Sequence, residues 1–217
     1  LEAVKFYSNY EIAKKVKNLF DYDDILESLV FIVEESEEAK KTKEGKQKIE
    51  FKQMGTADSS RVTQLRQQML EETDSDWFII LDGDEVWWDE PLAKLVKIIH
   101  NFGSRLDSIV VSYYNLVGDI FHYQDPKAGK YKIDGQIGNI TIRAINRKIP
   151  GLHVGGNYPL DSFYDKDETL VQDRKSSARV FLTEKPSYLH FSHLLRTSGF
   201  VTNRKTLNRS KKYKNEL

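Results

Sequence analysis

The chain has 217 residues, with 33 lysines and arginines balanced by 33 aspartates and glutamates. This length suits one sizeable domain, and a formal net charge of zero gives no global field that would attract nucleic acid. Cysteine is absent, which excludes a disulfide framework and a thiolate metal site but leaves open zinc bound by histidine and carboxylate.

The first 114 residues alternate between apolar strand-like runs and helical patterns. Strands alternating with helices imply βαβ units and a mainly parallel sheet. The expected fold class is therefore α/β, a Rossmann-like sheet flanked by helices. The predicted strands are 1–7, 28–33, 49–53, 77–81 and 108–114, and the predicted helices are 10–20, 61–72 and 91–102, with 35–48 a charged helix or loop.

From residue 115 the pattern changes to short strand-like pieces, 137–146 and 179–182, separated by loops. The stretch 150–172 is polar and aromatic, and long irregular segments in a compact domain are usually functional or disordered. The end, 203–214, is a basic helix or tail. We expect one domain over 1–217 in two halves, 1–114 and 115–217, the second smaller and mixed.

Three acids follow the apolar run 77–81: Asp82, Asp84 and Glu85. In open α/β folds, ligands bind where strands end. Clustered carboxylates repel one another unless a cation lies among them, and Mg²⁺ or Mn²⁺ prefers oxygen ligands together with substrate phosphates. The pattern predicts a metal–diphosphate site. The alternative is an acidic turn before a helix whose first turn favours acids.

These residues give the N-terminal half a resemblance to family 2 glycosyltransferases of the GT-A fold. Phe6-Tyr-Ser-Asn9 is similar to the end of that family's first strand, and Asp82-Gly-Asp84 matches its Asp-x-Asp motif. Arg66 lies 82 − 66 = 16 residues before Asp82, as in the family. The resemblance departs at Val33-Glu-Glu-Ser36, where the family often has Asp-Asp-Gly-Ser.

The resemblance implies a role for each matching residue. Asp84 would bind the metal directly, and Asp82 would bind the ribose or bind the metal through water. Arg66 would neutralise a phosphate or pair with Asp82; otherwise it is a surface arginine. Glu34 or Glu35 would accept a hydrogen bond from the nucleoside, or would be the solvated end of a strand.

A second group of polar residues lies in Tyr188-Leu-His-Phe-Ser-His-Leu-Leu-Arg196. Strand alternation places Tyr188, His190 and Ser192 on one face and His193 on the other. Glycosyltransferases of this fold often complete the metal shell with a late histidine, and we expect this to be His190 rather than His193. Arg196 would bind the diphosphate. The alternative is a structural histidine at a strand end.

Inverting transfer needs a general base near the acceptor hydroxyl. The candidates are Asp161 first, then Asp165 and His153, all in the loop 152–168; each could also be merely solvated. Gly155-Gly156 would permit this loop to close as a lid. The aromatic side chains Trp87, Trp88 and Tyr158 could form an acceptor platform or pack in the core.

We therefore expect an Mn²⁺- or Mg²⁺-dependent glycosyltransferase that uses a nucleotide-sugar donor and a glycan, lipid-linked or other hydroxyl acceptor. The alternatives are a nucleotidyltransferase, which would favour a glycine-rich phosphate loop that is not seen, and a non-catalytic glycan-binding module.

No apolar run approaches the ~20 residues of a membrane span, and no signal peptide is evident. We expect a cytoplasmic location, with peripheral membrane contact through the basic C-terminus as an option. The start at Leu1 suggests a trimmed or excised domain.

Overall fold

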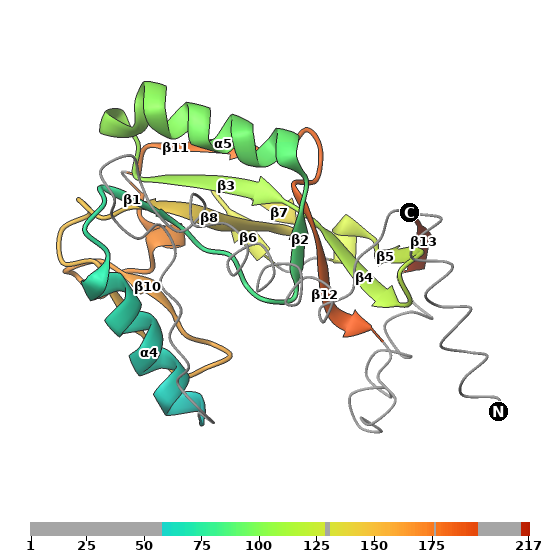
Figure 1. Cartoon of the computed structure of the whole chain (residues 1–217), viewed down its shortest axis with the longest axis horizontal. Helices are drawn as coiled ribbons and strands as arrows, with labels where there is room; N and C mark the ends of the chain where they lie inside the picture. Colours follow the sequence, from blue (N-terminus) through green and yellow to red (C-terminus); the bar gives the residue numbers. More distant parts are fainter. Residues whose placement is uncertain (1–57, 129–130, 176, 195–213) are drawn as a thin grey trace, which may run out of the picture. The chain divides into compact units, whose positions relative to one another are not determined.

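Two mixed β-sheets form the framework of the protein (Figure 1). The computed structural model describes residues 58–128, 131–175, 177–194 and 214–217. The chain divides into two compact units, Leu1–Gly55 and Thr56–Leu217, and all described residues belong to the second. Several predictions fall outside the described residues. They are the strands and helices expected before residue 58, the donor-site residues Glu34, Glu35 and Arg196, and almost all of the basic segment 203–214.

The first sheet has the strand order β1-β8-β3-β11, and the second has the order β13-β5-β4-β12-β2. Two further pairs, β9 with β10 and β6 with β7, form small two-stranded sheets. The strands are β1 (Trp77–Ile79), β2 (Glu85–Trp87), β3 (Ser108–Ser112), β4 (Tyr114–Gly118), β5 (His122–Gln124), β6 (Tyr131–Ile133), β7 (Gln136–Gly138), β8 (Ile140–Asn146), β9 (His153–Gly155), β10 (Ser162–Tyr164), β11 (Arg179–Leu182), β12 (Tyr188–Leu194) and β13 (Lys214–Glu216).

The expected helix-flanked, mainly parallel sheet is wrong. Among the described strands, only β3 with β11 and β4 with β12 pair in parallel, and α4 (Ser59–Glu72) and α5 (Asp89–Phe102) are the only α-helices in that part of the chain. The parallel arrangement fails because β8, from the second half of the sequence, lies between β1 and β3 and is antiparallel to both. Apolar runs predict strands, but they do not say which strands become neighbours.

Among the described strands, three stretches of chain pass from the first sheet into the second. β1 leads to β2, β3 leads to β4 through the single residue Tyr113, and β11 leads to β12. The predicted division of the chain at residue 114 therefore falls within a nearly continuous stretch of strand. As a result, side chains from three distant parts of the sequence meet where the chain crosses between the sheets.

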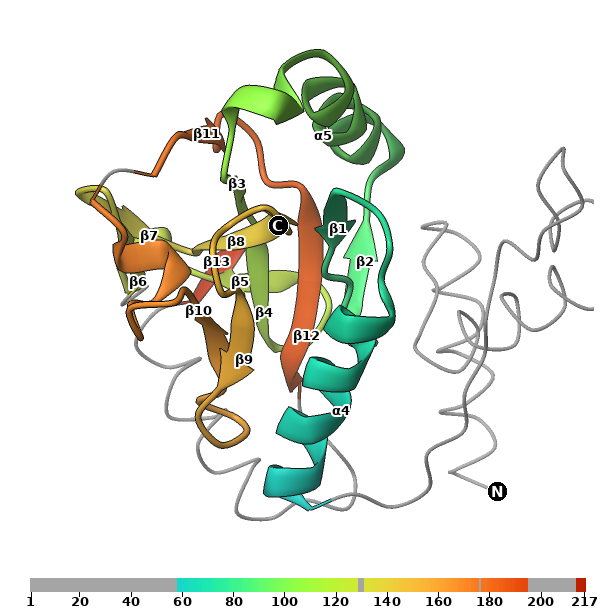
Figure 2. The ribbon, with the colours of Figure 1, turned by 90° about the vertical axis from the view of Figure 1, so that its left-hand side faces the viewer.

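The helices predicted at 61–72 and 91–102 are confirmed, each beginning two residues earlier. Asp58 caps α4 by accepting a hydrogen bond from the Arg61 N–H at 2.7 Å. α5 lies along β3 and β11 (Figures 1 and 2) and buries Leu95 completely. Val96, on the same helix, is half exposed. The core beneath α5 consists of Leu95, Ile109, Val111, Tyr113, Ala144, Leu182 and Tyr188.

Candidate functional site

The turn between β1 and β2 carries the three clustered acids. The backbone N–H of Ile80 donates to the carbonyl of Arg143 on β8 at 2.8 Å, and the N–H of Phe191 on β12 donates to the carbonyl of Asp84 at 2.9 Å. Hydrogen bonds thus hold the turn to one strand of each sheet. The alternative expected an acidic turn before a helix: the turn is present, but β2 follows it, and α5 begins only at Asp89.

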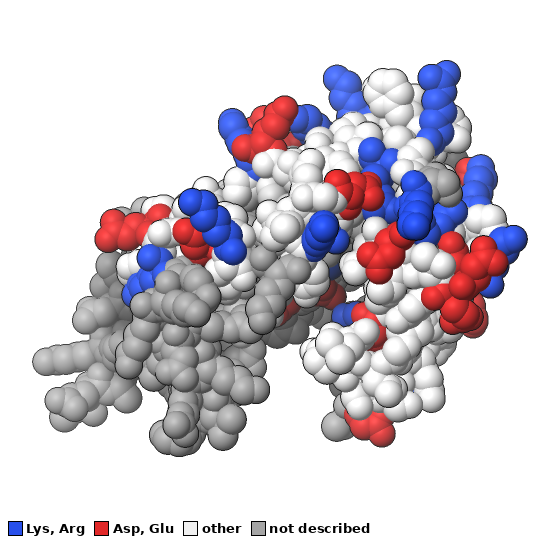
Figure 3. All heavy atoms as spheres, turned by 180° about the vertical axis from the view of Figure 1, so that it is seen from behind, with Lys and Arg blue, Asp and Glu red and all other residues white. Residues whose placement is uncertain are grey.

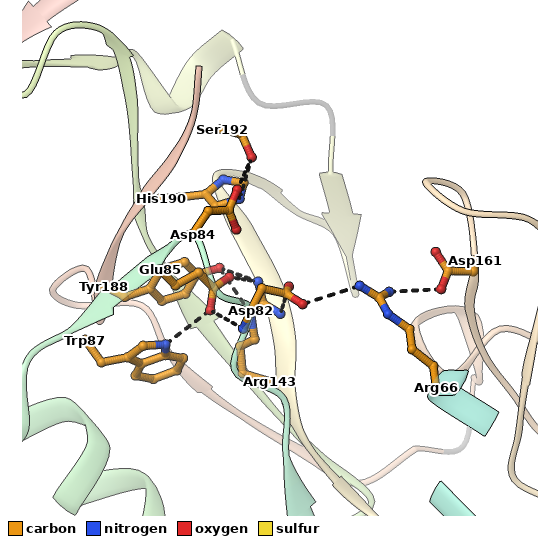
Figure 4. Close-up of polar contacts among 10 residues, drawn as sticks. All are labelled: Arg66, Asp82, Asp84, Glu85, Trp87, Arg143, Asp161, Tyr188, His190 and Ser192. Carbon is orange, nitrogen blue, oxygen red and sulfur yellow. Dashed lines mark hydrogen bonds and ion pairs between the residues drawn. The ribbon is translucent and has the colours of Figure 1, made fainter. Parts of the chain in front are cut away.

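Arg143 is the central cation of this site (Figure 4). Its Nη1 lies 2.9 Å from Asp82 Oδ2, and its Nη2 forms an ion pair with Glu85 Oε1. The Tyr188 hydroxyl accepts hydrogen bonds from both Nε and Nη2 of Arg143. The indole N–H of Trp87 donates to the other Glu85 oxygen at 3.2 Å. Glu85 is therefore a buried carboxylate with its charge paired and both oxygens hydrogen-bonded.

Burial and the neighbouring charges together set the pKa values in this cluster. Burial raises the pKa of Glu85 above its ordinary value, although the charge of Arg143 opposes the shift. Burial alone would lower the pKa of Arg143, but Tyr188, Glu85 and Asp82 together raise it above its ordinary range. Burial also raises the pKa of Tyr188. Arg143 therefore remains a fixed positive charge beside Asp82.

Asp82 is bound by two guanidinium groups, one on each oxygen. Arg143 contacts Oδ2, and Nη2 of Arg66 on α4 lies 3.3 Å from Oδ1. The other Arg66 nitrogen, Nη1, lies 3.0 Å from Asp161 Oδ2. Because both Asp82 oxygens are already paired with cations, binding a metal directly would compete with an arginine. This arrangement favours a role for Asp82 in binding the ribose, or in binding the metal through water. Direct coordination of the metal by Asp82 stays a prediction.

Asp84, Ser192 and His190 form a second, smaller group (Figure 4). The Ser192 hydroxyl donates to Asp84 Oδ2 at 2.6 Å and lies 2.9 Å from His190 Nε2. His190 Nε2 is 3.4 Å from the same Asp84 oxygen. The hydrogen bond with His190 is the largest cause of a pKa of Asp84 far below its ordinary value, and Ser192 adds to it while burial opposes it. Asp84 is therefore an ionised carboxylate beside an imidazole.

The donor set of Asp84 and His190 suits a divalent cation of the Mn²⁺ type. Two ligand atoms that share an ion at roughly 2.1 Å lie about 3 to 3.5 Å apart, and the separation of Asp84 Oδ2 from His190 Nε2 is 3.4 Å. Within the described residues, no group of three or more His, Cys, Asp or Glu side chains could hold a metal. Two protein ligands leave the other positions to phosphate oxygens and water, which is the usual arrangement for Mg²⁺.

Asp161 is part of a loop that packs on α4. The loop joins β9 to β10, and three side chains on one face of α4 hold it. Gln67 Oε1 accepts from the Val154 N–H at 2.7 Å, Thr63 Oγ accepts from the Tyr158 N–H at 3.3 Å, and Arg66 pairs with Asp161. The Asp161 side chain is only 1% exposed. Its role as a general base stays a prediction, and it would require the Arg66 pair to open.

Asp165, the second candidate base, stabilises a tight turn. Its Oδ1 accepts the N–H groups of Asp167 and Thr169 at 3.0 and 3.1 Å, and its Oδ2 lies 2.9 Å from Arg174 Nε. Burial would raise the pKa of Asp165, but these N–H groups and the Arg174 charge outweigh it and lower the pKa. A carboxylate held in this way is a weak proton acceptor, so the geometry gives Asp165 a structural role.

The Asp165→Asn variant should test that structural role. The folded-state pKa is lowered, so the stabilisation by Asp165 is present above the unfolded value of 3.8 and is lost as the pH falls through the lowered folded value. We expect the variant to melt a few degrees below the parent at pH 7, with a smaller difference near pH 3. Calorimetric melting at both pH values measures this. An equal deficit at both would mean that the Asp165 charge does not matter.

The structure does not bring the three predicted platform aromatics together. The Trp87 ring stacks on Tyr188 at 4.8 Å on the face that carries Glu85. The Trp88 and Tyr114 rings instead meet in a T-shaped arrangement, with their centroids 6.3 Å apart. Tyr158 lies beside Arg66, whose guanidinium carbon is 5.8 Å from the ring centre. Trp87 therefore packs against Tyr188, whereas Trp88 lies beside Tyr114 and Tyr158 beside Arg66.

Two contributors to the site were missed in the sequence analysis. Arg143 lies in the apolar strand β8, and a charged residue at a buried strand position signals a partner charge. Ser192 was placed on the face of His190 by alternation but was given no role. Ser192 could have been found by asking which polar side chains share a face with His190. For Arg143 the sequence offers only a charge within an apolar strand, because its partners depend on strand order.

The chain matches no model of a known protein family and no curated protein. In the part of the chain that the structure describes, no helix is long and apolar enough to cross a membrane. On the face drawn in Figure 3, basic and acidic side chains are interspersed. The described surface there offers no single-signed patch from which to infer a charged partner.

Proposed function

We propose that the protein is a metal-dependent glycosyltransferase that transfers a sugar from a nucleotide-diphosphate donor to a hydroxyl acceptor. The observation that carries this proposal is the pairing of Asp84 with His190 at 3.4 Å, in a turn where Arg66 and Arg143 flank Asp82. Carboxylate and imidazole suit the metal, and an arginine with exposed surface suits a phosphate. Arg66 is 35% exposed, whereas Arg143 is only 10% exposed.

Each residue then has a distinct task in the proposed reaction. Asp84 and His190 would hold the cation, which would supply Lewis-acid stabilisation of the leaving diphosphate. Arg66 exchanges a carboxylate partner for a phosphate oxygen. Arg143 keeps Asp82 in place from the buried side. In this assignment the positive charge of Arg66 and of the cation would lie where the leaving group gains negative charge, and such electrostatic stabilisation is usually the largest single contribution to catalysis.

The bond changes follow from this assignment. The acceptor oxygen attacks the anomeric carbon, its proton passes to a base, and the bond from the anomeric carbon to the diphosphate oxygen breaks with the electron pair leaving on the diphosphate. Asp161 stays the proposed base only if Arg66 releases it on binding the donor. The sugar and the acceptor, including a lipid-linked one, are not specified by these residues.

Titration calorimetry of the full chain with uridine and guanosine diphosphates, each with and without Mn²⁺, tests the proposal. Binding of a diphosphate that requires Mn²⁺ supports it. Absence of binding by both nucleotides would overturn it in favour of a glycan-binding module. Incorporation of a nucleoside monophosphate into product would indicate the nucleotidyltransferase alternative.

The Arg66→Ala variant should lose affinity for the diphosphate but not for the nucleoside. Removal of one charge-assisted contact costs about 1.5–3 kcal/mol, or roughly ten- to a hundredfold in affinity. Arg61→Ala is the matched control, because Arg61 is an exposed arginine on the same helix whose guanidinium hydrogen-bonds to Gln64 at 3.3 Å. If both variants bind uridine diphosphate as the parent does, Arg66 does not contact phosphate.

A further inference from the structure

A cavity lies on the opposite face of the five-stranded sheet from the acidic site. Residues paired in register on neighbouring strands share a face of the sheet. On one face Glu85 pairs with His190, and Trp87 pairs with Tyr188. On the other face Leu189 pairs with Val86 and with Tyr114. Because side chains alternate along a strand, Tyr114 faces away from His190 and Glu85. The cavity beside Tyr114 is therefore separate from the candidate metal site.

The cavity has a volume of about 540 Å³, within the range of small-ligand sites. Its apolar wall is the partly exposed Trp88 ring, with Tyr114 against it and a proline on each side, Pro91 from α5 and Pro186 from the loop before β12. Its rim carries charges of both signs, including the pair of Lys94 and Glu184, whose side chains are 53% and 87% exposed.

Backbone hydrogen bonds fix the walls of this cavity. The Trp88 N–H donates to the Ser187 carbonyl at 3.2 Å, and the Ser187 N–H donates to the Ser112 carbonyl at 2.7 Å. The Ser112 hydroxyl donates to the Lys185 carbonyl at 3.2 Å. The loop before β12 is thus tied to β3 and to the start of α5. A rigid aromatic wall loses little entropy when a ligand binds.

We propose that this cavity binds a neutral oligosaccharide. A sugar ring presents an apolar C–H face bordered by hydroxyl groups, which are both donors and acceptors. The exposed Trp88 ring matches the apolar face. The ammonium of Lys94 donates to hydroxyl oxygens, and the Glu184 carboxylate accepts from hydroxyl protons. A proline-rich peptide would instead need a groove lined by several aromatic side chains, whereas Trp88 is the one exposed aromatic residue among those lining this cavity.

The proposal goes beyond the transferase function and does not depend on it. A glycan held across the sheet from Asp84 would keep a polysaccharide attached to the protein without occupying the metal site. The experiment therefore measures binding of glycans and binding of nucleotide separately.

The test uses the full chain on an array of neutral oligosaccharides built from glucose, galactose, mannose and N-acetylhexosamines, followed by calorimetry with the best binder. Trp88→Ala should weaken that binder roughly fivefold or more, since stacking on an aromatic ring is worth about 1 kcal/mol or more. Trp88→Phe should retain part of the affinity. Phe121→Ala, at a residue as exposed as Trp88 (40% against 41%) but on the turn before β5, should change nothing.

Binding of uridine diphosphate with Mn²⁺ should be equal in the parent and in Trp88→Ala, which separates this proposal from the proposed function. Absence of any oligosaccharide binder would overturn it, as would a binder that Trp88→Ala and Phe121→Ala affect equally. Binding of a proline-rich peptide that Trp88→Ala abolishes, without glycan binding, would also overturn it and assign the cavity to a protein partner.

Discussion

The Asp84→Asn variant is expected to lose Mn²⁺-dependent binding of a nucleoside diphosphate while keeping the fold. Asparagine retains the shape of the side chain but removes the charge that a divalent cation requires. Loss of an outer partner of a metal ligand costs roughly 10- to 100-fold in metal affinity, so loss of a direct ligand should exceed that range. Ser192→Ala, which removes a hydrogen bond to Asp84, should fall within it.

Asp119→Asn is the matched control for this variant. Asp119 also pairs with a histidine, since its Oδ1 contacts His122 Nδ1. Burial would raise the pKa of Asp119, but the hydrogen bonds with His122 and the Phe121 N–H outweigh it and lower the pKa. Lys214 lies 3.4 Å from its other oxygen, and none of these residues is near the turn between β1 and β2 in the chain. Calorimetry should show parental affinity for Asp119→Asn. Equal losses in both variants, or parental binding by Asp84→Asn, would place the metal elsewhere.

The Arg143→Met variant is expected to have the largest effect on stability. It leaves Glu85, whose side chain is fully buried, without its counter-charge. Breaking a buried ion pair from one side costs about 3–5 kcal/mol, a large part of the 5–15 kcal/mol that stabilises an ordinary domain. Urea unfolding followed by tryptophan fluorescence measures the loss, because the Trp87 indole donates to Glu85 in the same cluster.

Lys148→Met serves as the control for burial. Lys148 pairs with Asp76 at 2.6 Å, but both side chains are about two-thirds exposed, and exposed pairs contribute about 0–1 kcal/mol. The double variant Arg143→Met with Glu85→Gln should recover part of the stability, because the buried charge is gone. Similar losses for Arg143→Met and Lys148→Met would show that the Arg143 cluster contributes no more than a surface pair.

Local patterns in the sequence were sufficient to predict several elements. The helical spacing of apolar residues located α4 and α5, and the apolar run from Trp77 located β1. Strand alternation placed Tyr188, His190 and Ser192 on one face, and the structure has His190 and Ser192 together at Asp84. These predictions depend only on neighbours within a few residues, and the periods of helix and strand do not change with the fold.

The tertiary structure decided which of these elements meet. The sequence does not indicate that β8 lies between β1 and β3, so it predicted the wrong fold class and gave no role to Arg143. Asp161 and Asp165 looked alike in the sequence, yet one is paired with Arg66 and the other with Arg174 and two backbone N–H groups. Partners 95 or 61 residues apart are chosen by strand order and packing, which no local pattern records. By itself the sequence determined the acidic turn and the helices α4 and α5. Only the packing of distant strands decided which acids are available and which are held by arginine.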